Sequence, residues 1–128
     1  MAWTFYADGG IAQKNTVTIA NGASVSDSVF LGGMILSRIE MPSAWTTAAL
    51  TAQISPDGGS TWTELYISDA AWSIASGVVA ASISLALPPA TGAQFQGTVR
   101  FRSGTSGAAV NQGGARTITL IALQLAAG

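Results

Sequence analysis

The chain has 128 residues, of which 48% are hydrophobic and 9% are charged, and its formal net charge is −1. This length suits one domain, and the apolar content excludes a disordered chain, because disordered segments are poor in apolar residues and rich in charge. With five basic residues and neither histidine nor cysteine, the chain lacks a basic face and the usual metal ligands, so we expect no nucleic-acid partner, no metal and no cofactor.

Short runs of β-branched, aromatic and aliphatic residues alternate with turn residues along the chain, which is typical of β-strands. Residues 3–7 form a first strand or an extended arm. Further strands are predicted over residues 16–20, 25–31, 34–41, 50–55, 61–66, 79–87, 98–103 and 116–125. Residues 43–49 have room for one helical turn, with Ser43 as its N-cap.

About eight strands without a substantial helix predict an all-β fold, a single-domain β-sandwich or jelly roll. We expect this domain to cover residues 16–128, preceded by an N-terminal arm or edge strand over residues 1–15. Strict alternation places Leu36 on the face opposite Ile39. The last segment is apolar on both faces, which predicts a central strand or one covered by a partner.

The sequence contains no run of about 18 apolar residues that would span a membrane. The first six residues also lack the basic and apolar regions of a signal peptide. We therefore expect neither a membrane partner nor secretion.

Few residues could support catalysis. Three of the carboxylates, Asp8, Asp57 and Asp69, lie in or beside turns, where aspartate accepts hydrogen bonds from nearby backbone amides. Glu40 and Glu64 could form the carboxylate pair of a glycosidase, but two exposed strand residues are the simpler interpretation. We expect the protein not to be an enzyme.

The sharpest local motif is Ser55-Pro56-Asp57-Gly58-Gly59-Ser60-Thr61-Trp62, which resembles the Asp-box hairpin known from sialidase propellers. All five defining positions match: Ser55, Asp57, Gly59, Thr61 and Trp62. The aspartate can accept hydrogen bonds from turn amides, the glycine permits a positive φ, and the tryptophan can pack over the hairpin. We interpret the motif as a structural turn, because one copy specifies a turn and not a function.

The aromatic residues allow two interpretations. Trp3, Phe5 and Tyr6 cluster near the N-terminus and could anchor the chain to a partner. Trp45 and Trp72, in loops, could be exposed platforms for sugar rings, although core packing is the commoner role of tryptophan in a small β domain.

Several segments in a consistent order resemble small structural proteins of tailed-bacteriophage virions. They lie within about residues 41–120 and comprise residues 41–50, 53–58, 102–106, 110–112 and 116–120. The resemblance implies a capsid decoration (cement) protein, a head fibre or a tail-associated protein, and it supplies no catalytic residues.

The resemblance and the uncharged composition together favour a decoration protein. Such a protein would bind and stabilise the lattice of the major capsid protein, as a homotrimer, on the capsid surface of the virion after synthesis in the bacterial host cytoplasm. The candidate contact residues are Trp3, Phe5, Tyr6, Arg100 and Arg102, with both arginines expected to point outward from their strand. The alternative is a carbohydrate- or receptor-binding module of a head fibre or tail.

Overall fold

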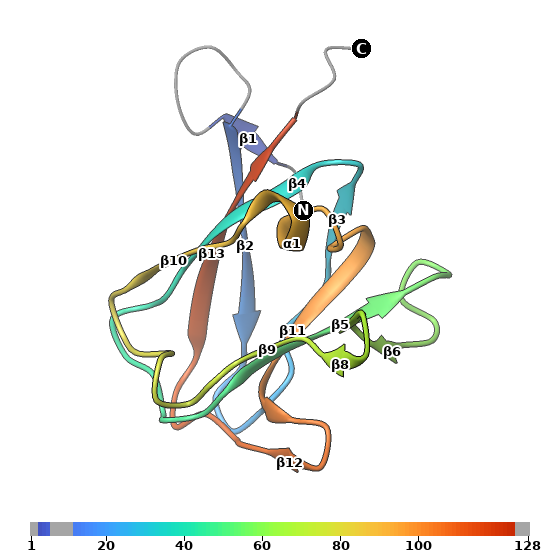
Figure 1. The fold of residues 1–128 in the computed structure, drawn as a ribbon. Coiled ribbons are helices and arrows are strands. Elements are labelled where there is room, and N and C mark those ends of the chain that lie inside the picture. The colour runs from blue at the N-terminus through green and yellow to red at the C-terminus, as the bar shows by residue number, and fades with distance from the viewer. Residues whose placement is uncertain (1–2, 6–11, 125–128) are drawn as a thin grey trace.

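The computed structural model describes residues 3–5 and 12–124. Its described part is all-β, as the sequence predicts, and its paired strands are antiparallel (Figure 1). The first sheet has the strand order β1-β2-β13-β4-β10, with bounds β1 Thr4–Phe5, β2 Ala12–Ile19, β13 Arg116–Leu123, β4 Ile35–Glu40 and β10 Ser84–Ala86.

The second sheet has the order β12-β11-β5-β6, with β3 also paired to β11 and β9 to β5. Their bounds are β12 Ala108–Ala109, β11 Gly97–Thr105, β5 Leu50–Ser55, β6 Thr63–Glu64, β3 Val29–Gly32 and β9 Ser73–Ile74. A hairpin of β7 (Tyr66–Ile67) and β8 (Ala70–Ala71) and a single helical turn, α1 (Pro89–Gly92), complete the described elements.

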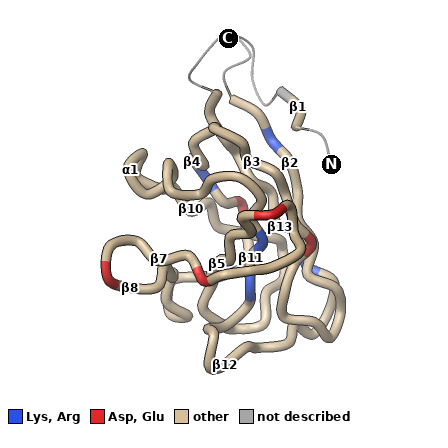
Figure 2. The backbone as a smooth tube through the Cα atoms, turned by 90° about the vertical axis from the view of Figure 1, so that its right-hand side faces the viewer, with Lys and Arg blue, Asp and Glu red and all other residues tan. Residues whose placement is uncertain are grey.

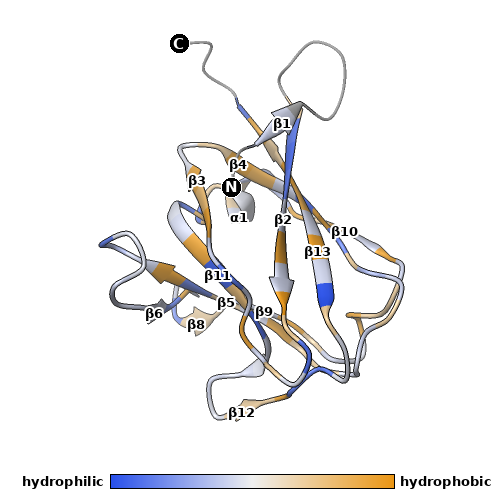
Figure 3. Ribbon diagram, turned by 180° about the vertical axis from the view of Figure 1, so that it is seen from behind, coloured by the Kyte–Doolittle hydropathy of each residue, from blue (hydrophilic) through white to orange (hydrophobic). Residues whose placement is uncertain are grey.

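The core lies between the two sheets, which gives a β-sandwich. One continuous apolar cluster contains Val17 and Leu120 from the first sheet and Leu50 and Phe101 from the second, all with no exposed surface. Figure 3 shows the apolar stretches along the strands of both sheets. Burial of both inner faces is the main stabilising contribution in such an architecture. The jelly-roll connectivity stays a prediction.

A β-bulge in β4 overturns the strict alternation expected there. The register passes from Ile121 opposite Arg38 to Ala122 opposite Leu36, so Ser37 is the additional residue on β4. The bulge turns Leu36 to the same side as Ile39, and both side chains are fully buried. The carbonyl of Ser37 accepts a hydrogen bond of 2.9 Å from the amide of Leu87, the residue that follows β10.

Strand β13 is central, as its two apolar faces predict. It pairs with β2 along one side and with β4 along the other. Ile118 and Leu120 point into the core, whereas Ile121 lies on the outer face and is still only 3% exposed.

Other segments depart from the sequence-based expectations. Residues 43–49 contain no helical turn, and the helical turn of the structure begins after Pro88. The predicted strand over residues 79–87 is reduced to β10, because Ser82 adopts a φ of 60° in a turn. The division drawn after residue 15 falls inside β2.

Among the described residues, no helix has the length and apolarity to cross a membrane.

Candidate interaction face

The outward side of the second sheet carries a line of polar side chains across three strands. On β11, Val99 and Phe101 are fully buried, as alternation predicts, so Arg100 and Arg102 lie on the opposite, outer side. The register places Gln53 of β5 beside Arg100, and Glu64 of β6 beside Gln53. Residues from three separate segments of the chain are thus brought together by strand pairing alone.

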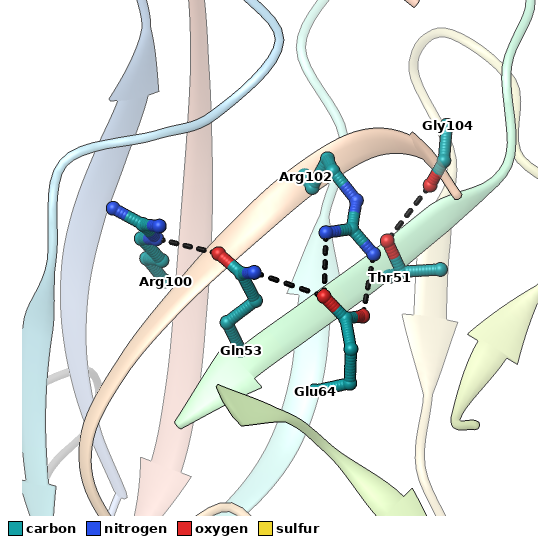
Figure 4. Close-up of polar contacts among 6 residues, drawn as sticks. All are labelled: Thr51, Gln53, Glu64, Arg100, Arg102 and Gly104. Carbon is teal, nitrogen blue, oxygen red and sulfur yellow. Dashed lines mark hydrogen bonds and ion pairs between the residues drawn. The ribbon is translucent and has the colours of Figure 1, made fainter. Parts of the chain in front are cut away.

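These side chains form one hydrogen-bonded network (Figure 4). The Nε of Arg100 donates to Gln53 Oε1 over 2.7 Å, and Gln53 Nε2 donates to Glu64 Oε1 over 2.9 Å. Both terminal nitrogens of Arg102 donate to the two oxygens of Glu64. Bidentate geometry of this kind is the strongest form of arginine–carboxylate pairing.

Arg102 is therefore no free surface cation, which corrects the expectation that both arginines are available for contact. It is only 6% exposed, and its Nε atom has no hydrogen-bond partner within the part of the chain that the structure describes. The hydrogen bonds from Arg102 are the main cause that holds the pKa of Glu64 below its ordinary value. The pair connects β6 to β11 across β5. It is a structural contact, since loss of Glu64 would leave the buried charge of Arg102 without its partner.

Arg100 is in a different position. Its guanidinium carbon lies 4.2 Å from the centroid of the Trp62 ring, which is a cation–π geometry. Burial, and next the charge of Arg102, lower its pKa, while Glu64 opposes this. Only its Nε has a hydrogen-bond partner among the described residues, so the two terminal nitrogens remain available.

The Asp-box-like hairpin positions Trp62 for this contact. The Ser55 hydroxyl donates to Asp57 Oδ1 over 2.8 Å, and the Gly59 amide donates to the same hydroxyl over 2.7 Å. Asp57 also accepts from the amide and the hydroxyl of Thr61, each over 2.8 Å. Together with the φ of 109° at Gly59, these bonds fix the backbone conformation of the turn that leads to Trp62.

The hydrogen bonds of this hairpin also shift the titration of Asp57. The backbone amide of Thr61, followed by the Thr61 and Ser55 hydroxyls, lowers the pKa of Asp57 from 3.8 to about 2. The ionised carboxylate is the form that these donors stabilise.

An exposed phenylalanine lies next to the network. Phe30 of β3 is the register partner of Thr98 on β11, so it shares the outer side with Thr98 and Arg100. Its side chain is 64% exposed. We call the outward surface around Phe30, Trp62 and Arg100 the aromatic–arginine face.

Trp3, from the N-terminal segment, is attached to the domain beside this face. Its indole nitrogen donates to the carbonyl of Phe30 over 2.7 Å, and its ring packs against the core cluster. Trp3 and Phe30 line a hollow of about 380 Å³ together with Gln13, Leu31, Gly33, Met34 and Gln124. Phe5 is the second residue of β1, but its side chain, like the whole of Tyr6, lies outside the described residues.

The two tryptophans considered as sugar platforms are not exposed platforms. Trp72 is only 9% exposed and packs edge-on against Phe95, with ring centroids 4.8 Å apart, which corrects that expectation. Trp45 is half-buried, packs against the core and donates to the carbonyl of Ala48 over 3.3 Å.

Glu40 and Glu64 do not form a carboxylate pair. Glu40 lies on β4 of the first sheet and accepts a hydrogen bond from Ser84, whereas Glu64 lies on β6 of the second sheet and binds Arg102. In the described part of the chain, no group of three or more acidic, histidine or cysteine residues is arranged to hold a metal ion.

Sequence reasoning overlooked Phe30 and the pairing of Arg100 with Trp62. The signal for Phe30 was present, because buried Val29 and Leu31 on either side of it leave Phe30 pointing outward.

No known protein-family model matches the chain, and no curated protein matches it either.

Proposed function

We propose that the chain is a structural protein of a tailed-phage virion, a decoration protein that binds the major capsid lattice as a homotrimer. The observation that carries the proposal is the aromatic–arginine face, which presents an exposed Phe30 beside a fixed Arg100–Trp62 pair. Tryptophan and arginine are the residues most enriched among those that dominate binding energy in protein interfaces.

The remaining surface suits a protein that is covered by neighbours. Charged side chains are few and scattered along the backbone (Figure 2). The outer side of the first sheet carries threonines in register, Thr18 opposite Thr117 and Thr16 opposite Thr119. Such a surface loses little hydration energy when it is buried, because it holds few full charges.

The likeness of residues 41–120 to virion structural proteins supports the same proposal. Small contacts repeated by symmetry give a decoration protein its avidity, so each copy needs only one modest contact face. The alternative of a carbohydrate-binding module depended on Trp45 and Trp72 as exposed platforms, and their positions in the structure do not favour it.

The proposal is tested with empty capsids assembled from the major capsid protein encoded in the same genome. We expect the purified chain to have the mass of a trimer by light scattering. It should bind these capsids saturably, with a fixed number of copies per particle, and should raise the temperature at which they open. A chain that leaves the capsids bare but attaches to purified tails or fibres would contradict the proposal.

A further inference from the structure

The charges of the polar network do not balance on the aromatic–arginine face. Arg102 and Glu64 neutralise each other through a bidentate pair. The hydrogen-bond partner of Arg100 is the neutral amide of Gln53, so its positive charge has no direct counter-charge. The network of Arg100, Gln53, Glu64 and Arg102 therefore carries one positive charge in excess, although the ionised Asp57 lies in the adjoining hairpin.

Arg100 is also held in place before any partner arrives. Trp62 supports one side of the guanidinium at 4.2 Å, and Gln53 fixes its Nε over 2.7 Å. Gln53 is itself fixed by its bond to Glu64. A long side chain that is already ordered loses little conformational entropy on binding, so more of the interaction energy appears as affinity.

The free part of Arg100 has the shape of a carboxylate receptor. Its two terminal nitrogens form a planar fork that matches the two oxygens of one carboxylate. A phosphate backbone requires several cations, and the neighbouring Arg102 is already neutralised. A sugar ring would stack on the aromatic face, but the guanidinium of Arg100 already covers one face of Trp62.

The exposed ring of Phe30 lies near Arg100 and would contact the partner surface around a carboxylate bound there. Arg100 is two residues along β11 from Thr98, the register partner of Phe30. Diagonal neighbours of this kind lie about 7–8 Å apart in an antiparallel sheet. A matching partner surface therefore presents an acidic side chain beside an apolar depression that receives the exposed ring.

We infer that Arg100 is the docking point for an aspartate or glutamate side chain of the capsid partner, with Phe30 inserting beside it. This inference rests on the proposed function and specifies the chemistry of its contact. Because the guanidinium is half-buried, the pair is less screened than one between fully exposed charges.

The test compares Arg100→Gln with Arg38→Gln, which removes the same charge from the exposed residue Arg38 on the first sheet. We expect Arg100→Gln to weaken binding to empty capsids by roughly 10- to 100-fold, and Arg38→Gln to bind within about 2-fold of the wild type. Arg100→Lys, which keeps the charge but not the fork, should fall between them. Circular dichroism and the trimer mass verify that each variant is folded.

A second readout separates a carboxylate contact from a general effect on the face. Wild-type affinity should fall as salt rises from 50 to 500 mM, and Arg100→Gln should show a shallower dependence. If the wild type binds and Arg100→Gln binds equally well with the same salt dependence, this inference is overturned while the proposed function stands. If the wild type does not bind capsids, both are overturned.

Discussion

Gln112 is a buried side chain whose amide uses all of its hydrogen-bonding capacity. Its Oε1 accepts from the Thr46 amide over 2.8 Å and from Arg116 Nε over 3.0 Å. Its Nε2 donates to the Thr46 carbonyl over 3.0 Å and to the Ser103 hydroxyl over 2.6 Å. One glutamine thus joins the loop at Thr46, 66 residues away in the chain, to Ser103 of β11 and Arg116 of β13 at one end of the sandwich.

Replacing Gln112 with alanine should lower the free energy of unfolding by about 2–4 kcal/mol, because polar groups in a site only 1% exposed lose their partners. Urea unfolding followed by tryptophan fluorescence measures this. Gln94→Ala is the matched control and should change stability by less than about 0.5 kcal/mol, since Gln94 is exposed and makes one long bond to Ala90. Equal effects of the two variants would show that the buried network contributes nothing.

Asp57 should make the stability of the protein depend on pH. Its folded-state pKa of about 2 lies below its ordinary value of 3.8, so folding favours the ionised form. This contribution is complete above about pH 5 and is lost as pH falls through about 2. Asp57→Asn should therefore lower the thermal midpoint at pH 7, and its difference from the wild type should shrink as pH approaches 2.

The measurement is a series of thermal melts between pH 7 and pH 2 on the wild type, Asp57→Asn and Asp69→Asn. Asp69 is an exposed carboxylate between β7 and β8, and its amide variant should follow the wild type throughout. A difference between Asp57→Asn and the wild type that stays constant with pH would mean that the ionised carboxylate is not what the hairpin stabilises.

Strand β11 contributes residues both to the aromatic–arginine face and to the Gln112 network. Its first half pairs with β3 and carries the aromatic–arginine face, and Ser103 near its end belongs to the Gln112 network. At Gly104 the strand takes a φ of 94° and enters the turn to β12. A Cβ at this position would lie 2.4 Å from the carbonyl oxygen of Ala108.

Gly104→Ala should therefore cost about 3 kcal/mol or more, since both the positive φ and the contact with backbone oppose it. Gly107→Ala, in the same hairpin, has open space around the added methyl group and should be neutral to within about 0.5 kcal/mol. Urea midpoints of the two variants decide the matter. A Gly104→Ala protein as stable as Gly107→Ala would mean that the turn rearranges at little cost.

Periodicity predicted the elements best where strands are regular. The bounds of β5 and the inward direction of Val99 and Phe101 followed from alternation alone. Alternation failed at Leu36, because one additional residue in β4 reverses the facing of everything beyond it and leaves no mark in composition. Alternation gave no prediction for Trp72, which was expected in a loop, because a run of two-residue strands carries no periodicity to read.

The candidate face was predictable only in part. The Asp-box-like turn fixes Ile54 opposite Thr63 and Gln53 opposite Glu64, so that pairing could have been inferred from the motif. The pairing of Arg102 with Glu64 could not have been inferred from the motif, because the two residues are 38 positions apart in the chain. Which of two neighbouring arginines is neutralised depends on that long-range pairing.

At the scale of the whole molecule, the Gln112 network joins several of the segments on which the proposed virion role is based. Thr46, Ser103, Gln112 and Arg116 lie in four of those segments and meet in one network. These four segments together hold one end of the sandwich in place. The proposed contact residues Phe30 and Trp62 lie outside those segments, which allows one fold to present different surfaces to different partners.

The N-terminal segment is attached to the sandwich through β1 and Trp3. Among the described residues, β1 pairs with β2 at Thr4 and Phe5, and Trp3 adds the bond to Phe30 and a ring packed on the core. The central strands do not depend on it, because β13 and β11 are each paired on both sides by other segments.

Removing residues 1–5 should therefore leave a folded domain with an unfolding free energy lower by about 2–4 kcal/mol, from lost burial of the Trp3 ring and one hydrogen bond. Trp3→Phe is the graded control, since it keeps most of the packing, removes only the indole donor and should cost about 1 kcal/mol. Urea unfolding with circular dichroism gives both values. A truncated chain as stable as the wild type would mean that Trp3 does not dock on the domain in solution, and an unfolded one would make β1 part of the essential sheet.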